Sequence, residues 1–415
     1  MTPTTLEAYE PVVGRQVLDE LRYLAEHLQG RRIQHVNSTA VGGGVAEILA
    51  RLVPLLTELG LPSRWDVIMG DPAFFRVTKT VHNALHGQPA VFTRRDARTF
   101  LDTTARNLKT FAWDGDIVFI HDPQPAGLIQ AKPAHGGRWI WRCHVDVSAP
   151  HLGVWRFLER FVNRCDAAVF SAPQFAQRLA IRQFLIAPSI DPLSDKNREL
   201  APETIQAILH RLEIPQDKPL VTQVSRFDRL KDPVGVIEAF RLVRRTVDCR
   251  LLLVGGGASD DPEGAQVLAE VRTRAQDDPD ILIRELPPTS HLEVNALQRA
   301  STVIIQKSLR EGFGLTVSEA LWKGKPVVAS AVGGIPLQIA HKHSGLLCRS
   351  VEGAAFALKQ LLNSPRYAQQ LGERGREHVR QNFLLTRHLK EYLLLLVAVE
   401  RAGDIIHLNN APGIR

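Results

Sequence analysis

Short apolar runs alternate with amphipathic segments along most of the chain. In the first half, apolar runs occur at residues 32–37, 116–121, 138–141 and 167–170, with helical or loop segments between them. The same rhythm returns at residues 219–224, 250–254, 281–284, 302–305 and 326–329. Short buried strands that alternate with helices are typical of a parallel sheet covered by helices on both faces. The pattern therefore predicts an α/β protein with two doubly wound units.

The division between the two units is expected where two prolines interrupt the pattern, near residues 188–192. A chain of 415 residues exceeds what a single hydrophobic core usually serves. We expect an N-terminal domain over residues 1–190 and a C-terminal domain over residues 191–385, facing each other across a cleft. A final helix, placed at residues 386–410, is expected to pack back on the first domain.

Composition and charge narrow the class of protein. The chain is 44% hydrophobic and 23% charged, as in ordinary globular proteins. Its formal charge of +7 comes from scattered basic residues with no run of five, so neither a nucleic acid nor a membrane surface is the expected partner. The longest apolar stretch, residues 393–399, is too short to span a bilayer. Four widely spaced cysteines without a CxxC pair or a signal peptide predict a reduced, cytoplasmic protein.

The strongest chemical signal lies at residues 310–320. Glu311 and Glu319 stand eight residues apart around a glycine-rich turn that leads into a helix. Backbone N–H groups at a helix N-terminus favour a phosphate. Glu319, one turn into the helix, is placed to reach a ribose diol, and Glu311 can accept hydrogen bonds from a sugar ring. The alternative is a surface turn with ordinary helix glutamates.

A second signal is the pair Arg226 and Lys231, which follows the strand predicted at residues 219–224. Ligands of open α/β sheets bind at the carboxyl ends of the strands. A guanidinium and an ammonium at this place can share a diphosphate, the first through two parallel hydrogen bonds and the second as a point charge. The alternative is a pair of solvated cations.

Two weaker signals follow strands of the first half. The glycine-rich segment 38–47 lets the backbone approach a ligand closely, but it is not GxGxxG and does not indicate a dinucleotide. The segment 139–146 delivers His144 and Asp146 to the end of a strand, where the pair can bind sugar hydroxyls. A lone histidine with a structural role is the alternative for His144.

Together, the four segments resemble the GT-B glycosyltransferases of the large family that includes the sucrose and glycogen synthases. Glu311 and Glu319 match that family's hallmark of two glutamates separated by seven residues, and Arg226 and Lys231 match its diphosphate-binding pair. The resemblance implies two Rossmann-like domains, transfer with retention of the anomeric configuration, and no required cofactor or metal ion. Asp114-Gly115-Asp116 imitates a metal-binding DxD motif, but it precedes a buried strand and is interpreted as a turn.

Four segments of the first half, at residues 35–47, 74–85, 121–126 and 141–144, resemble the trehalose synthases within that family. This implies a hexosyltransferase that makes trehalose from a nucleoside diphosphate glucose, such as UDP-glucose or ADP-glucose, and free glucose. A retaining trehalose phosphorylase remains an alternative, as does a related hexosyltransferase with another acceptor. A sugar-nucleotide sensor without catalysis and a basic nucleic-acid-binding protein are less favoured, because both glutamates and both cations are present and no aromatic-rich basic strip occurs.

The patterns and the resemblance together assign roles to individual residues. The catalytic residues expected are Arg226, Lys231, Glu311 and His144. The residues expected to bind the nucleotide sugar are Gly43, Gly44, Arg226, Lys231, Glu311, Gly312, Phe313, Gly314, Leu315, Thr316 and Glu319. The residues expected to bind the acceptor are Asn37, Glu47, Lys79, His82, Asn83, Gln124 and Asp146. The expected partners are a small sugar and a sugar nucleotide, and the sequence leaves a monomer and a homodimer both open.

Overall fold

The computed structural model describes residues 5–41, 43–256 and 264–401. The chain forms two compact units, of which the first comprises Met1–Ile186 with Leu385–Arg415 and the second comprises Ala187–Leu384. Residues 402–410 of the expected C-terminal helix lie outside the described residues.

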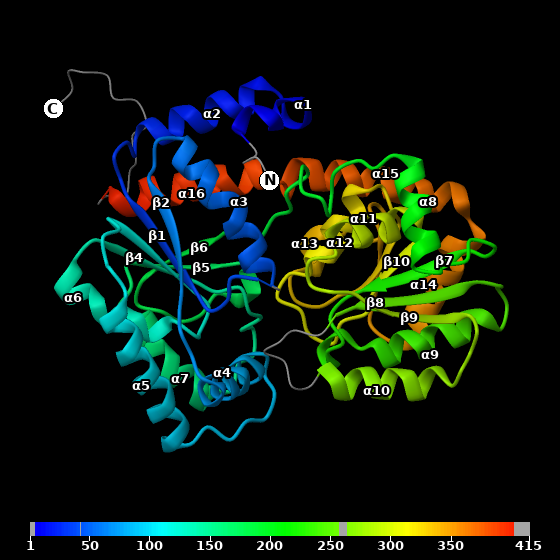
Figure 1. Ribbon diagram of the computed structural model, residues 1–415, viewed down its shortest axis with the longest axis horizontal. Helices are drawn as coiled ribbons and strands as arrows, with labels where there is room; N and C mark the ends of the chain where they lie inside the picture. The colour runs from blue at the N-terminus through cyan, green and yellow to red at the C-terminus, as the bar shows by residue number, and fades with distance from the viewer. Residues whose placement is uncertain (1–4, 42, 257–263, 402–415) are drawn as a thin grey trace. The chain divides into compact units, whose positions relative to one another are not determined.

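The first unit is built on a six-stranded parallel sheet with the strand order β2-β1-β3-β4-β5-β6. Its strands are β1 (Ile33–Asn37), β2 (Ser63–Val67), β3 (Ile117–His121), β4 (Arg138–Arg142), β5 (Ala167–Phe170) and β6 (Arg182–Leu185). Its helices are α1 (Glu10–Val13), α2 (Arg15–Glu26), α3 (Gly44–Glu58), α4 (Pro72–Leu85), α5 (Arg94–Thr110), α6 (Lys132–His135), α7 (Leu152–Val162) and α16 (Leu385–Glu400). Figure 1 shows the strands of this sheet between its helices.

The C-terminal helix α16 joins the first unit although it follows the second in sequence. Most of its apolar side chains are buried, with Leu389 and Leu393 fully so, whereas Leu394 is exposed. The helix packs along α2, and two ion pairs flank it: Lys390 Nζ lies 2.6 Å from Glu20 Oε1, and Arg31 Nη2 lies 2.6 Å from Glu400 Oε2. Apart from Leu394, the residues of the apolar stretch 393–399 are therefore buried by packing within the unit. None of the helices among the described residues has both the length and the apolar character needed to cross a bilayer.

The second unit repeats this plan with a six-stranded parallel sheet in the order β12-β11-β10-β7-β8-β9. Its strands are β7 (Leu220–Val224), β8 (Arg250–Gly255), β9 (Ile281–Glu285), β10 (Val303–Gln306), β11 (Val327–Ser330) and β12 (Leu346–Cys348). Its helices are α8 (Pro202–Arg211), α9 (Pro233–Arg244), α10 (Gly264–Ala275), α11 (His291–Ala300), α12 (Leu315–Trp322), α13 (Ile335–Gln338), α14 (Val351–Asn363) and α15 (Pro365–Asn382). The predicted pair of doubly wound α/β units is confirmed.

Alternation along the buried strands explains why helices cover both faces of the second sheet. Leu251 and Leu253 of β8 belong to the core beneath α9, α10 and α14, whereas Leu252 and Val254 belong to the core beneath α8 and α11. Successive strand side chains point to opposite faces, so a run of leucines and valines requires apolar cover on both sides. Because helices cover both faces of the sheet, a ligand is expected to bind at the carboxyl ends of its strands.

Each sheet has one point at which the order of strands reverses. In the first unit β1 lies between β2 and β3, and in the second β7 lies between β8 and β10. The connections that leave the carboxyl ends of the central pairs, β1 with β3 and β7 with β10, run in opposite directions. Ligands of open α/β sheets bind outside the carboxyl ends of the strands at such points.

Candidate active site

The switch point of the second unit brings together two residues that are 80 positions apart in the sequence. Lys231 ends the short 3-10 helix η4 (Arg229–Lys231) after β7, and Glu311 follows β10. The Lys231 ammonium donates to Glu311 Oε2 across 2.6 Å, and the two side chains are 19% and 8% exposed. The Ser308 hydroxyl donates to the same oxygen across 3.1 Å. The mostly buried Glu311 carboxylate thus holds the Lys231 ammonium at the carboxyl edge of the second sheet.

The turn after Glu311 is fixed by its neighbours. A Cβ atom on Gly333, whose φ is +53°, would lie 1.6 Å from the Glu311 carbonyl oxygen, so only glycine fits there. The Gln338 amide donates to the Phe313 carbonyl across 2.5 Å. Helix α12 then begins at Leu315 after Gly314, which has the left-handed φ of +83°. This turn leads the chain into α12 with its first N–H groups at the carboxyl edge.

Backbone donors at the start of α12 have no protein acceptor among the described residues. This holds for the N–H groups of Gly314, Leu315 and Thr316, and no side chain caps the helix. The first N–H groups of a helix carry a partial positive charge and bind anions readily. The arrangement can therefore hold the oxygen atoms of a phosphate group.

Arg226 lies on the same loop as Lys231 but makes a different contact. Its guanidinium is 3.7 Å from the Asp228 carboxylate, and its side chain is 43% exposed. Asp228 also accepts the N–H of Leu230 across 2.7 Å and so caps η4. The structure brings Lys231 and Glu311 into direct contact, and it places Arg226 beside Asp228 on the same loop.

Sequence reasoning missed a second cation beside this pair. Lys307, which directly follows β10, is 6% exposed, and its ammonium contacts the Asp232 carboxylate. Asp232 has the left-handed φ of +49° and accepts the N–H of Gly235 at the start of α9. The signal available in the sequence was the position of Lys307 directly after a predicted strand.

Glu319 lies inside α12 and is almost completely buried. Its carboxylate is 3.5 Å from the Lys196 ammonium, and its side chain is 5% exposed. Lys323, one turn later, donates to the carbonyl of Glu319 and to the amide oxygen of Asn197. Burial lowers the pKa of Lys323 to about 7, and the Glu319 charge opposes that change. The sequence identified this glutamate but not the two lysines around it.

At the carboxyl edge of the first sheet, His144 is held at two points. Its backbone N–H donates to Asp122 Oδ1 across 2.7 Å, and its ring Nε2 lies 3.1 Å from His121 Nδ1. Asp122 has the left-handed φ of +67°, an unusual conformation for a residue other than glycine. Burial raises the pKa of its carboxyl group to about 7. His144 is therefore fixed in both backbone and ring.

Other residues that the sequence assigned to the acceptor follow the same strands. Asn37 ends β1, and its amide oxygen accepts the indole N–H of Trp65 across 2.9 Å. Asp146 is buried, and its carboxylate accepts the N–H of Ser148. Gln124 follows β3, and its side-chain oxygen has no hydrogen-bond partner among the described residues. These side chains follow the carboxyl ends of β1, β3 and β4.

The glycine-rich segment leads directly into α3. Gly43 has an extended backbone at the position before the helix, Gly44 is the first helical residue, and Glu47 lies in the first turn. The backbone N–H of Glu47 donates to the Gly43 carbonyl across 3.1 Å. The expected segment therefore opens a helix at the end of β1.

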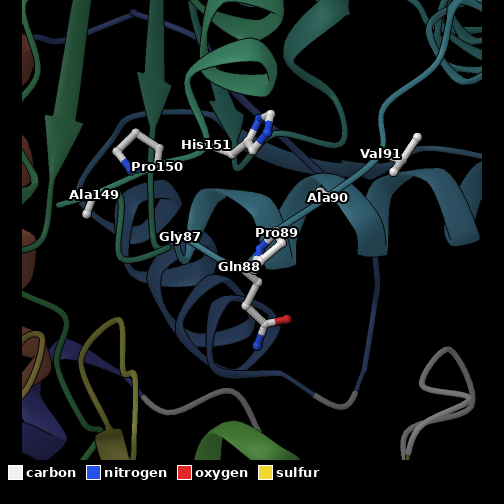
Figure 2. A pocket seen from close by; sticks show the side chains of 8 residues that line it. All are labelled: Gly87, Gln88, Pro89, Ala90, Val91, Ala149, Pro150 and His151. Atoms are coloured by element: carbon white, nitrogen blue, oxygen red, sulfur yellow. The ribbon is translucent and has the colours of Figure 1, made fainter.

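The remaining predicted acceptor residues, Lys79, His82 and Asn83, are half-buried on α4. Beyond the C-terminal end of α4 lies an open cavity of about 500 Å³. Figure 2 shows its lining: Gly87, Gln88, Pro89, Ala90, Val91, Ala149, Pro150 and His151. The backbone N–H of His151 donates to the carbonyl of Ala84, which ties one wall of this cavity to α4. None of the predicted site residues lines it.

The acidic residues of the DxD-like segment pair with two different arginines. Asp114 lies 2.9 Å from Arg64, and Asp116 accepts the backbone N–H of Arg32 across 2.9 Å. Among the described residues, no group of three or more His, Cys, Asp or Glu side chains is arranged to hold a metal ion. All four cysteines are free and buried.

Comparisons with known proteins agree with this geometry. The family described as "Trehalose synthase, N-terminal domain" matches residues 35–177, and the family described as "Glycosyl transferases group 1" matches residues 205–378. The solved structure of an alpha,alpha-trehalose-phosphate synthase (UDP-forming) from Burkholderia vietnamiensis has a TM-score of 0.74 at 16% identity, over 91% of this chain and 99% of that one. Fold and family matches define an enzyme of the GT-B glycosyltransferase class.

The sequence relatives narrow this class. A trehalose synthase from Pyrococcus horikoshii is 44% identical over 397 residues, which cover 94% of this chain and 95% of the relative. A trehalose phosphorylase from Pleurotus pulmonarius is 29% identical over 98% of this chain and 62% of the relative. The chain belongs to the trehalose synthase family, which confirms the resemblance found in the sequence.

Proposed function

We propose that this protein is a retaining glucosyltransferase that makes trehalose from a nucleoside diphosphate glucose and free glucose. The observation that carries the proposal is the Lys231–Glu311 pair, which lies at the switch point of the second sheet. Beside it, the backbone donors that open α12 have no protein acceptor among the described residues. A cation next to free N–H groups suits a diphosphate. The match to trehalose synthases supports glucose as the transferred sugar and the acceptor.

The second unit is proposed to bind the nucleotide sugar. Lys231 and Arg226 would neutralise the diphosphate, and the N–H groups from Gly312 to Thr316 would bind its oxygen atoms. Glu311 would orient the Lys231 ammonium and accept a hydrogen bond from a hydroxyl group of the glucose. Glu319 would accept hydrogen bonds from the ribose hydroxyls. One of its carboxylate oxygens, Oε1, also lies 3.5 Å from the Lys196 ammonium.

The first unit is proposed to hold the acceptor and part of the transferred glucose. His144 would donate a hydrogen bond to the glucose, and Asp146 and Gln124 follow strands of the same sheet. Asn37 and Glu47, with Gly43 and Gly44 between them, belong to the segment that leads from β1 into α3. Lys79, His82 and Asn83 of α4 complete the set proposed for the acceptor.

The proposed mechanism is a front-face displacement. The acceptor hydroxyl attacks on the side from which the diphosphate leaves, through a transition state with oxocarbenium character. Negative charge grows on the departing diphosphate as the glycosidic bond breaks. Preformed donors aimed at that charge stabilise the transition state more than the ground state. Lys231, Arg226 and the opening of α12 would supply that stabilisation, and no step requires a metal ion.

Phosphorolysis of trehalose is the second candidate. The same cations would meet an inorganic phosphate, and a trehalose phosphorylase is among the relatives. That relative is less similar, and this chain spans 62% of its length, whereas it spans 95% of the Pyrococcus horikoshii trehalose synthase. The comparison favours the synthase.

A donor panel tests the proposal. UDP-, ADP- and GDP-glucose are each supplied with free glucose, and the product is identified by chromatography against a trehalose standard. A parallel reaction supplies trehalose with inorganic phosphate or with each nucleoside diphosphate. We expect trehalose from at least one nucleotide sugar, and cleavage of trehalose by the matching diphosphate. Cleavage with phosphate alone would establish the phosphorylase instead.

A further inference from the structure

Three histidine rings of the first unit form one hydrogen-bonded chain. His35 Nδ1 lies 3.0 Å from His121 Nε2, and His121 Nδ1 lies 3.1 Å from His144 Nε2. His35 is in the middle of β1, His121 ends β3, and His144 follows β4, so the chain runs from the interior of the sheet to its carboxyl edge. His35 also stacks on Phe119, with ring centroids 4.8 Å apart.

All three rings are expected to be neutral near pH 7. Burial lowers the pKa of His35 to about 3, and it lowers the pKa values of His121 and His144 well below the usual range. The Arg142 guanidinium, itself fully buried, lowers the pKa values of His121 and His144 further. A neutral imidazole has one N–H donor and one acceptor nitrogen. Each contact between the rings then requires a donor on one side and an acceptor on the other.

This requirement leaves only two arrangements of protons. In the first, every ring carries its proton on Nδ1, and hydrogen bonds run from His35 through His121 to His144. In the second, every ring carries its proton on Nε2, and the bonds run in the opposite direction. One choice therefore determines the tautomers of all three rings, because the hydrogen bond at one nitrogen decides the state of the other.

The buried end of the chain favours the first arrangement. His35 Nε2 is buried and has no hydrogen-bond partner among the described residues. In the second arrangement this atom would be an N–H donor left unpaired in the core, which folded proteins avoid more strictly than an unpaired acceptor. In the first arrangement it is a bare acceptor nitrogen. The other end, His144 Nδ1, then carries a proton and has no protein acceptor within the described ranges.

We propose that His35 and His121 are positioning residues that fix His144 as its Nδ1–H tautomer, so that it presents a hydrogen-bond donor to an oxygen atom of the transferred sugar. The donor role rests on the proposed function, whereas the tautomer does not. The contact between the His144 backbone N–H and Asp122 holds the residue while the ring chain sets its proton. Two buried histidines, one within β1 and one at the end of β3, thus act on the site through His144.

Nitrogen NMR of the full chain tests the tautomer directly. Histidine is labelled with ¹⁵N, and long-range ¹H–¹⁵N correlation spectra distinguish Nδ1–H from Nε2–H rings by their shifts and cross-peak patterns. The signal of each ring is assigned by its loss in single variants. We expect Nδ1–H at His35, His121 and His144, against the Nε2–H form that free histidine prefers in water. An Nε2–H form at His144, or a mixture of the two, would overturn the proposal.

Two substitutions of His35 connect the tautomer to the reaction. His35→Phe keeps the stacking on Phe119 but removes the donor that starts the chain. We expect His144 to lose its pure Nδ1–H form. Turnover should fall by about 10- to 100-fold, the loss seen when a residue that orients a metal-binding side chain is removed in other proteins. His35→Asn places an amide donor near the position of Nδ1 and is expected to restore turnover to within about threefold of wild type.

His388 provides the matched control. It is a buried histidine of α16, and neither of its ring nitrogens has a partner among the described residues. Its burial, together with nearby charges that include those of His121 and His35, lowers its pKa well below the usual range. His388→Phe is expected to leave the tautomer of His144 and the turnover unchanged. Should His35→Phe keep the wild-type tautomer at His144, the positioning role of His35 is wrong. If wild-type protein has Nδ1–H at His144 but transfers no glucose, the tautomer assignment is supported and the proposed function is overturned.

Discussion

Replacement of Lys231 by methionine separates catalysis from stability in the second unit. The variant keeps the aliphatic stem and removes the ammonium that lies 2.6 Å from Glu311 Oε2. Charge on the diphosphate grows as the glycosidic bond breaks, so the lost contact should cost more in the transition state than in the ground state. One lost transition-state donor is worth about 2.7 to 4 kcal/mol. We therefore expect turnover to fall by about 100- to 1,000-fold.

The same substitution should also destabilise the fold. The Glu311 side chain is only 8% exposed, and Lys231→Met removes the cation from its carboxylate while the Ser308 hydroxyl still donates to it. An unpaired buried polar group costs about 1 to 3 kcal/mol. Glu311→Gln added to Lys231→Met removes that uncompensated charge. The double variant should regain most of the free energy of unfolding but should not regain turnover, because the leaving-group contact is still absent.

A second ion-pair lysine of the same unit serves as the control. Lys218 precedes β7 at the opposite edge of the sheet, and its ammonium lies 3.0 Å from both Asp248 and Asp280. Lys218→Met should lower stability and leave turnover unchanged. The assay is steady-state kinetics with saturating acceptor and varied donor, on variants with a cooperative melting transition. If Lys231→Met retains turnover within about threefold, worth only about 0.7 kcal/mol, while its donor KM rises, the leaving-group role is refuted.

Four further predictions concern the same unit and its chemistry. Arg226→Lys should lower turnover at least about tenfold, because an ammonium cannot form two parallel hydrogen bonds to phosphate; wild-type kinetics would contradict this role. Glu319→Gln should raise the donor KM about tenfold, near the 1.5 kcal/mol of a hydrogen bond to a charged group, and unchanged donor use would exclude Glu319 from the ribose site. Because the pKa of Lys323 is lowered to about 7 in the fold, the unfolded chain binds a proton that the folded chain lacks between pH 7 and 10.5, so wild-type stability should rise with pH relative to Lys323→Met; parallel stability curves would contradict the shift. Activity should survive EDTA, and a loss that magnesium restores would overturn the metal-free mechanism.

The sequence predicted the central strands of both sheets but not three of the edge strands. Strands β2 and β6 are the outer strands of the first sheet, and both contain charged residues with half-buried or exposed side chains. Strand β12 is the outer strand of the second sheet and has only three residues. Edge strands need no continuous apolar run, because one side of the strand has no neighbour. Hydrophobic patterning therefore has little signal for them.

The candidate site was predicted as separate residues and not as contacts. Lys231 and Glu311 were each identified by local patterns, but their pairing depends on β7 lying beside β10, which the order of strands along the chain does not reveal. The partners Lys307, Lys196 and Ser308 lie outside the motifs. The histidine chain was missed for the same reason, since His35 and His121 are 86 residues apart and meet only because β1 pairs with β3.

Retaining transfer of glucose to glucose from a nucleotide donor can be followed through the anomeric form of the first product. The enzyme is mixed with glucose and the nucleoside diphosphate α-glucose that it uses best, and ¹H NMR spectra are collected from the earliest turnovers. We expect the anomeric signal of α,α-trehalose to appear as the donor signal falls, with one nucleoside diphosphate released per disaccharide. A β-linked disaccharide as the first product, or release of glucose without disaccharide, would contradict it.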